Sequence, residues 1–265
     1  MGVKRAVQLV ERTLGENPGE KLYTIGPIIH NRQVIDDLAK RGVIIADSSD
    51  DIPEGSTAVI RAHGIPVSLQ RELENKKILL KDGTCPNVIA SRKLVEKYSS
   101  SGYKIYIAGD ENHGEIKCLA GSALNCEVLL SSEQAAAASP PEKSILISQT
   151  TLKQEEFDSI CAILKTVNPK LIIKNTICRA TELRQKAVSD LVIETDAVIV
   201  IGGKNSANTQ RLYYTARNSG IPSWHIETVN DIPEEIVRYG TVGITAGAST
   251  PDYIIDEVES YLLRL

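Results

Sequence analysis

Two stretches of this sequence share one pattern and decide the expected fold. Residues 78–85 read ILLKDGTC, and residues 171–178 read LIIKNTIC. In each, an apolar run typical of a buried strand leads through a short turn to a cysteine, and a helix-like pattern follows. A thiolate at a helix N-terminus faces the positive end of the helix dipole, which favours its ionised, metal-binding form. Cys85 and Cys178 occupy equivalent places in repeated units, which suggests that they converge on one centre.

Strand-like apolar runs alternate with helix-like segments along the whole chain. Strands are predicted at residues 21–25, 43–46, 57–60, 77–80, 104–108, 127–130, 144–148, 171–174, 197–202, 223–226 and 241–245. Helical patterns lie between them, among others at residues 31–41, 67–75, 87–98, 154–167, 181–192 and 208–219. This alternation predicts an α/β protein with mostly parallel sheets.

The strand, turn and helix pattern repeats in three units of similar length. The first of these units begins with a helix. Four apolar residues there follow one another at helical spacing: Val3, Val7, Val10 and Leu14. No strand precedes that helix, whereas a strand and a turn precede each cysteine-bearing helix. We therefore expect three pseudo-symmetric α/β lobes, at 14–84, 85–177 and 178–265, with the first helix (1–13) associated with the third lobe.

Composition excludes several classes of protein. The 265 residues are 42% hydrophobic, enough for real cores, and the formal net charge of −4 gives no basic footprint for nucleic acid. No apolar stretch approaches the length of about 18 residues that a membrane span needs. The five cysteines are an odd number, and the start of the sequence lacks the apolar core of a signal peptide. A disulfide framework is therefore not expected, and a reducing cytoplasm is favoured.

Motifs for nucleotide binding do not occur. Gly202-Gly203-Lys204 follows a predicted strand, but the spacing of a phosphate-binding P-loop is not present there. No Gly-x-Gly-x-x-Gly follows any strand, and no His-Glu-x-x-His occurs. The sequence thus indicates neither nucleotide hydrolysis nor a dinucleotide fold.

Three of the four histidines stand in loops directly after predicted strands. These are His30, His63 and His113. One such histidine is most often structural, but three in equivalent places favour ligand binding, because open α/β sheets bind ligands at the carboxyl ends of their strands. His225 lies within a strand-like run, and we expect it to be structural.

Three further polar segments follow a strand and precede a helix. They are SQTT at 148–151, KNSANT at 204–209 and AGASTPD at 246–252. Each contains a residue suited to cap a helix, and capping is the simple interpretation. The same hydroxyls and amides at helix N-termini can also hold phosphate oxygens. Three such segments and three histidines favour a doubly phosphorylated ligand that is held without many lysines or arginines.

Eight motifs carry a resemblance to a known family. In order, they are GPIIHN, RAHGI, TCP, HxE, QTTL, NTICxAT, KNSxNT and TAGASxPD. With the opening GVKRAV, they make the chain resemble the 4-hydroxy-3-methylbut-2-enyl diphosphate reductase family over essentially its whole length. The resemblance implies three lobes around a central cavity. It implies reductive dehydroxylation of that diphosphate to isopentenyl and dimethylallyl diphosphate, the last step of the non-mevalonate isoprenoid pathway, with electrons from a ferredoxin or flavodoxin.

The resemblance also implies a cofactor, a [4Fe-4S] cluster on three cysteines with one iron open to the substrate. Cys85 and Cys178 match the second and third ligands. The first would stand one position before Met1. We expect Met1 to be an internal methionine of a Cys-Met-Gly-Val segment, with about a dozen more residues upstream. Cys118 could offer a spare sulfur, although burial of a small side chain is the simpler interpretation.

The substrate site is implied by the same motifs. Contacts with the diphosphate or the substrate hydroxyl are assigned to His30, His63 and His113. The diphosphate cradle is assigned to Ser206, Asn208 and Ser249. Glu115 is the implied proton source, Thr150 lies on the route to the substrate hydroxyl, and Thr181 lines the cavity. A second serine that is frequent in the family is Ala207 here, which removes one donor.

Two other interpretations remain open at this point. A non-catalytic relative without a cluster would bind a diphosphate or a partner, but it would not need Glu115 and Thr150. A dehydratase resembling quinolinate synthase would also use a cluster in three lobes. The Ser-x-Asn cradle and the His-x-Glu pair argue against that second alternative.

Overall fold

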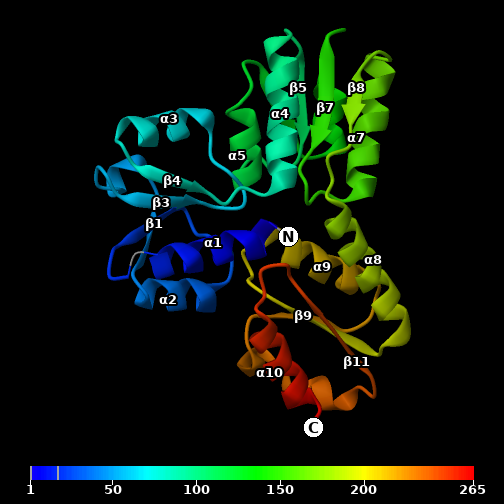
Figure 1. Cartoon of the computed structure of the whole chain (residues 1–265). Coiled ribbons are helices and arrows are strands. Elements are labelled where there is room, and N and C mark those ends of the chain that lie inside the picture. The colour runs from blue at the N-terminus through cyan, green and yellow to red at the C-terminus, as the bar shows by residue number, and fades with distance from the viewer. Residues whose placement is uncertain (1, 17) are drawn as a thin grey trace. The chain divides into compact units, whose positions relative to one another are not determined.

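The computed structural model describes residues 2–16 and 18–265 (Figure 1). Every strand pair within them is parallel, and the strands form three separate sheets. The predicted α/β class with parallel sheets is therefore confirmed. Met1, and with it the expectation of an internal methionine, lies outside the described residues. The chain forms two compact units: unit 1 holds Met1–Ile28 and Arg41–Cys178, and unit 2 holds Ile29–Lys40 and Arg179–Leu265.

The first sheet of unit 1 has the order β2-β1-β3-β4. Its strands are β1 (Leu22–Ile25), β2 (Val43–Ala46), β3 (Thr57–Ile60) and β4 (Leu79–Asp82). One face packs on the short helix η1 (Ser49–Asp51) and on α3 (Val67–Asn75), in a cluster that includes Tyr23, Ile60 and Leu73. Helix α1 (Gly2–Glu16) contacts β1 and β3 of this sheet. Its expected association with the third lobe stays a prediction.

The face that α1 buries differs from the predicted apolar stripe. Ala6, Val10 and Thr13 are its buried residues, while Val3 and Val7 are only partly covered. Small side chains at the contact allow a helix to approach a sheet closely. A Cβ added to Gly83, the residue after β4, would lie 3.4 Å from the Cβ of Ala6. Close packing, more than hydrophobicity, therefore selects the buried face.

The second sheet of unit 1 repeats the order of the first, as β6-β5-β7-β8. Its strands are β5 (Lys104–Ala108), β6 (Cys126–Leu129), β7 (Ser144–Ser148) and β8 (Ile172–Lys174). Helices cover both faces: α4 (Pro86–Ser100) and α5 (Gly114–Ala120) on one side, and α6 (Ser132–Ala137) and α7 (Gln154–Val167) on the other (Figure 1). Alternate residues of β5 enter the two cores, with Ile105 and Ile107 facing α4 and α5, and Tyr106 facing α7.

Unit 2 is built on a three-stranded sheet of order β10-β9-β11. Its strands are β9 (Ala197–Ile201), β10 (Ser223–Ile226) and β11 (Val242–Ala246). One face packs on α8 (Arg179–Glu194) and α9 (Ala207–Asn218), and the other on α10 (Asp252–Leu262). Helix α2 (Arg32–Lys40) and the short helices η2 (Val229–Asp231) and η3 (Glu234–Arg238) also belong to this unit. Every residue of β9 is buried, as expected for a central parallel strand.

All the predicted strands are present within about two residues, and one shift has a clear cause. Strand β4 begins at Leu79 instead of Lys77. Lys77 has φ 55°, a left-handed conformation that no strand residue adopts and that is uncommon for a side chain other than glycine. The boundaries of the expected lobes remain a prediction. In the described part of the chain, no helix has both the length and the apolar character of a membrane span.

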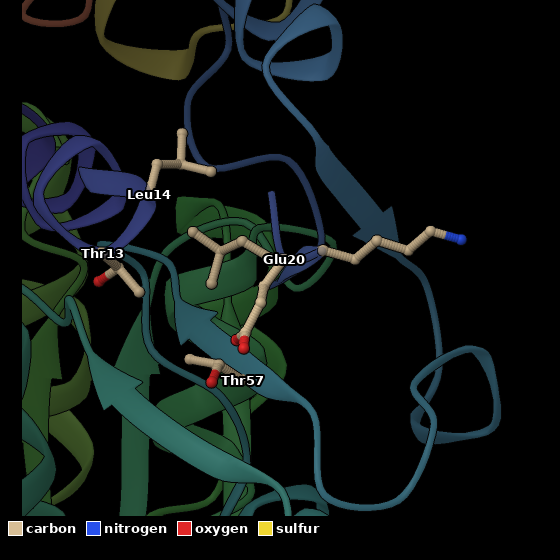
Figure 2. A pocket seen from close by; sticks show the side chains of 6 residues that line it. Thr13, Leu14, Glu20 and Thr57 are labelled. Atoms are coloured by element: carbon tan, nitrogen blue, oxygen red, sulfur yellow. The ribbon is translucent and has the colours of Figure 1, made fainter. Parts of the chain in front are cut away.

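A small pocket lies beneath the end of α1 in unit 1 (Figure 2). It is a partly open hollow, lined by Thr13, Leu14, Glu20, Lys21, Leu22 and Thr57. None of the predicted site residues lines it, so we do not associate it with the candidate site.

Candidate active site

A buried carboxylate lies where the carboxyl ends of β5 and β7 meet. Glu115, in the first turn of α5, is 1% exposed. Its Oε1 accepts a hydrogen bond from the backbone N–H of Thr150, and its Oε2 accepts one from the Thr150 hydroxyl, both at 2.7 Å. Because β5 and β7 are neighbours in the sheet, the strand order itself brings these two predicted residues together.

The two histidines predicted in unit 1 lie beside this carboxylate. The rings of His63 and His113 are in edge-to-face contact, with centroids 4.8 Å apart. His113 is the N-cap residue of α5, and its Nδ1 accepts a hydrogen bond from the Glu115 N–H at 3.2 Å. His113 ends the loop after β5, as predicted. Helix α5 begins directly after it and carries Glu115 in its first turn, which fixes the relative positions of the two residues.

Backbone and side-chain contacts connect both predicted cluster cysteines to the same region. The N–H of Cys178 donates to the Thr150 carbonyl at 2.8 Å, and the N–H of Cys85 donates to the Ala62 carbonyl, next to His63, at 2.9 Å. Asn87, in the first turn of α4, donates from Nδ2 to Cys178 Sγ at 3.0 Å. Unit 1 thus gathers six predicted residues, Cys85, Cys178, His63, His113, Glu115 and Thr150.

The two cysteine turns have the same local structure, as the repeated sequence pattern predicts. Asp82 Oδ1 accepts from the Thr84 N–H at 2.8 Å, and Asn175 Oδ1 accepts from the Ile177 N–H at 2.9 Å. Each acceptor stands three residues before a cysteine, where a short polar side chain stabilises a turn. Cys85 is the N-cap of α4, and Cys178 directly precedes α8.

The beginning of α1 reaches Cys85. A Cβ added to Gly2 would lie 2.7 Å from Cys85 Sγ, closer than any side chain could remain. Arg5 donates to the Thr84 carbonyl at 3.1 Å. Glycine is therefore needed at position 2 to admit the sulfur.

In unit 2, the loops after β9 and β11 carry three of the remaining predicted residues. Ser206 is the N-cap residue of α9, and its hydroxyl accepts from the Thr209 N–H. Asn208 Nδ2 and Ser249 Oγ are buried, and neither has a hydrogen-bond partner in the part of the chain described. Buried polar groups without partners are costly, so these two atoms indicate a place for a polar ligand.

Close glycine contacts hold these loops together. A Cβ on Gly247 would lie only 2.0 Å from the Thr209 hydroxyl oxygen, so the loop that carries Ser249 touches the first turn of α9. A Cβ on Gly203 would lie 1.8 Å from the carbonyl oxygen of His30, which brings His30 beside the β9–α9 loop. Unit 2 therefore brings together His30, Ser206, Asn208 and Ser249.

The remaining predicted residues in unit 2 have less direct evidence. Thr181 lies buried in the first turn of α8, without a described contact to the other predicted residues. Ala207 is the first residue of α9. Asn87 was not predicted, because nothing in its local pattern distinguishes it from an ordinary helix residue. Thr209 and Gly247 stand in the polar segments predicted at 204–209 and 246–252, but no individual role was predicted for them.

The other cysteines differ from Cys85 and Cys178. Burial raises the pKa of Cys118, Cys126 and Cys161 to about 11 in each case, so they are neutral thiols at physiological pH. Cys118 is fully buried, and Cys126 and Cys161 pack against the two cores of the second sheet. Their structural interpretation is favoured.

Comparison with known proteins now decides the family. A family model described as LytB protein matches residues 1–263. The chain belongs to the LytB family. The 4-hydroxy-3-methylbut-2-enyl diphosphate reductase of Treponema denticola is 45% identical to it, with 99% of this chain and 95% of that protein covered. The reductase of the same name from Aquifex aeolicus is 40% identical, with 100% and 92% covered.

Solved structures of the LytB family are also similar to this chain. The E-1-hydroxy-2-methyl-but-2-enyl-4-diphosphate reductase from Plasmodium falciparum has a TM-score of 0.92 at 27% identity, with 100% of this chain and 84% of that chain covered. A second structure, of a (E)-4-hydroxy-3-methyl-but-2-enyl diphosphate reductase described as the terminal enzyme of the non-mevalonate pathway, has a TM-score of 0.75 at 38% identity. That match covers 100% and 95% of the two chains.

The cysteines of this LytB-family chain have the chemistry that a cluster requires. Cys85 and Cys178 are free and partly exposed, and Asn87 places a donor on the sulfur of Cys178. Thiolate ligands with hydrogen-bonded sulfurs are typical of iron–sulfur sites. Over residues 2–16 and 18–265, no three His, Cys, Asp or Glu side chains are grouped as a metal site. The fit to a cluster thus depends on the chemistry of Cys85 and Cys178 alone.

Proposed function

We propose that this protein removes the hydroxyl group of 4-hydroxy-3-methylbut-2-enyl diphosphate by adding two electrons and two protons, to give isopentenyl or dimethylallyl diphosphate and water. One proton goes to the departing oxygen, and the other, from solvent, goes to the allylic carbon. One observation carries the proposal. The buried Glu115–Thr150 pair lies between a pair of histidines and Cys178, so a proton donor adjoins both an anion-binding group and a sulfur ligand. The names of the curated relatives describe the same reaction.

In this proposal, Cys85 and Cys178 would hold a [4Fe-4S] cluster. The cluster, when bound, would supply the two electrons and a Lewis acid for the departing oxygen. A ferredoxin or flavodoxin would deliver the electrons. Asn87 would orient the sulfur of Cys178 through its hydrogen bond, because donors around a ligand atom fix its geometry.

Glu115 gives the proton that the leaving oxygen needs. Hydroxide is a poor leaving group until it is protonated, so a general acid is required. The Thr150 N–H donates to Oε1, which leaves Oε2 and the Thr150 hydroxyl as the pair that can exchange a proton. Thr150 then relays the proton from the carboxyl group to the substrate hydroxyl. The His113 cap on the Glu115 N–H keeps this carboxyl group in place.

The diphosphate is held by polar groups without a large excess of charge. The groups proposed for this role are His63 and His113 in unit 1 and, considered separately, His30, Ser206, Asn208 and Ser249 in unit 2. Phosphate oxygens would satisfy Asn208 Nδ2 and Ser249 Oγ, and Thr181 would line the cavity for the carbon chain. Binding at the diphosphate also positions the allylic hydroxyl, which lowers the entropy cost of the chemical step.

We also place the reaction in the cytoplasm. All five cysteines are free, as expected in a reducing compartment. Neither a nucleic acid nor a membrane is part of the proposed function.

An anaerobic assay of the protein tests the proposal. The protein, with its iron content measured, is mixed with the hydroxylated diphosphate and a chemical reductant, and the products are identified by NMR. We expect both isoprenoid diphosphates, and none from Cys178→Ser. A diphosphate-binding relative without catalysis is the alternative. Tight binding of the substrate by an iron-replete protein that forms no product would establish that alternative.

A further inference from the structure

A cationic side chain that the proposed reaction does not use lies within the candidate site of unit 1. Arg61 follows β3 directly and stands two residues before His63. A Cβ on Gly114 would lie 2.5 Å from one terminal nitrogen of its guanidinium group, and a Cβ on Gly26 would lie 2.8 Å from the other. Gly114 separates His113 from Glu115. The guanidinium group is therefore wedged between two glycine backbones, beside both histidines.

The charge of Arg61 is not balanced by its surroundings. Its Nε is buried without a hydrogen-bond partner, and in the described part of the chain no carboxylate pairs with the group. The titratable neighbour that acts on it is Cys118, which is a neutral thiol at physiological pH. Burial lowers the pKa of Arg61, but a guanidinium group remains charged at neutral pH. A half-buried cation without a counter-ion is unfavourable, so an anionic ligand is the natural partner.

The proposed substrate has the charge that this cation lacks. A diphosphate carries several negative charges at neutral pH. The residues assigned to hold it are imidazoles, hydroxyls and an amide, and none of them bears a permanent positive charge. A fixed cation among such groups strengthens the binding of a phosphate considerably.

We propose that Arg61 is a further binding residue, which supplies the fixed positive charge that attracts the diphosphate to the side of His63 and His113. The inference rests on the proposed function only in taking a diphosphate as the ligand. Gly26 and Gly114 leave room for the guanidinium group, because a side chain at either position would displace it.

Calorimetric titration of the full-length protein with inorganic pyrophosphate tests this role. Arg61→Met keeps an unbranched apolar stem and removes the charge, whereas Arg61→Lys keeps the charge. Arg71→Met, at an exposed position of α3, removes the same net charge elsewhere and is the control. We expect Arg61→Met to weaken pyrophosphate binding about tenfold, Arg61→Lys to retain most of the affinity, and Arg71→Met to bind normally.

Thermal unfolding of the same variants separates binding from a structural role. Removal of an unbalanced charge should leave the melting temperature of Arg61→Met unchanged or raise it. Pyrophosphate binding by Arg61→Met that equals that of Arg71→Met would overturn the inference. The inference would also be overturned if Arg61→Met and Arg61→Lys both melted at a lower temperature and both lost pyrophosphate binding to the same extent. A protein that binds pyrophosphate through Arg61 but reduces no substrate would contradict the proposed function alone.

Discussion

Thr150 donates to both carboxylate oxygens of Glu115, one from its backbone N–H and one from its hydroxyl group, each at 2.7 Å. The two residues are 35 positions apart, yet each follows one of two adjacent strands, β5 and β7. A contact that is set by the pairing of strands is rigid. The carboxyl group of Glu115, the proposed proton donor, is therefore already positioned before the substrate binds, which favours catalysis.

Glu115→Gln should abolish most of the activity. An amide cannot give up a proton, and general acid catalysis contributes about 10²–10⁴-fold to rates. We expect kcat to fall at least 100-fold, while KM changes little because the diphosphate contacts are intact. Anaerobic steady-state kinetics measures both constants. Glu111→Gln, at an exposed position four residues earlier, should behave as wild type. A Glu115→Gln variant with normal kcat would rule out the proton-donor role.

Serine substitutions should separate the cluster ligands from the structural cysteines. Cys85→Ser and Cys178→Ser should each lower bound iron and sulfide to less than about half after anaerobic reconstitution, since a thiolate ligand is lost. Cys118→Ser should retain both, because burial raises the pKa of this thiol to about 11 and leaves it neutral. Iron and acid-labile sulfide analysis provides the readout. Loss of iron from Cys118→Ser together with retention in Cys178→Ser would reverse the assignment.

Gly247→Ala should disturb the diphosphate cradle of unit 2. The new methyl group would lie 2.0 Å from the Thr209 hydroxyl oxygen, so the loop with Ser249 must move. We expect a loss of about 1–3 kcal/mol in the free energy of unfolding and weaker pyrophosphate binding. Chemical denaturation and calorimetry measure the two effects.

A double variant that combines Gly247→Ala with Thr209→Ala tests the cause of the expected loss in stability. Removing the hydroxyl makes room for the methyl group, so the double variant should lose less stability than the sum of the two single changes. Gly15→Ala is the matched control, because nothing lies within 4 Å of a Cβ there, and helix α1 should gain about 0.5–1 kcal/mol. Strict additivity in the double variant would contradict the contact between Thr209 and Gly247.

His225 should make the protein less stable in mild acid. Burial lowers its pKa below the usual 6.5, and in the neutral ring Nε2–H can donate to the Gly202 carbonyl at 2.8 Å. The unfolded chain therefore binds a proton at higher pH than the folded one. The stabilisation is complete above about pH 6.5 and is lost as the pH falls through the lowered folded pKa.

His225→Gln keeps a donor for the Gly202 carbonyl but does not titrate. The difference in unfolding free energy between wild type and this variant should shrink as the pH falls, by about 1.4 kcal/mol for each unit that separates the folded and unfolded pKa values. Urea unfolding from pH 8 to pH 5 measures it. A difference that stays constant over this range would show that His225 titrates alike in both states.

Much of the fold followed from local sequence pattern, and the failures have physical causes. Buried parallel strands are continuous apolar runs, so their positions can be predicted from the sequence, as for Ala197–Ile201. The start of β4 was missed because the left-handed backbone of Lys77 has no signature in the sequence. The apolar spacing of α1 includes the buried Val10 but not the buried Ala6 and Thr13, because a hydrophobic pattern does not register burial of small or polar side chains.

The sequence by itself determined the α/β class, the repeated cysteine turns and the family, because strand runs, turn residues and ordered motifs are properties of short stretches of chain. Only the tertiary structure decided which of these stretches meet. It placed Thr150 in contact with Glu115, Asn87 in contact with Cys178, and Arg61 between two glycines, where no carboxylate of the described residues pairs with it. Such contacts depend on the order of strands in a sheet and on the packing of side chains across it. Residues distant along the chain share no local pattern that records them.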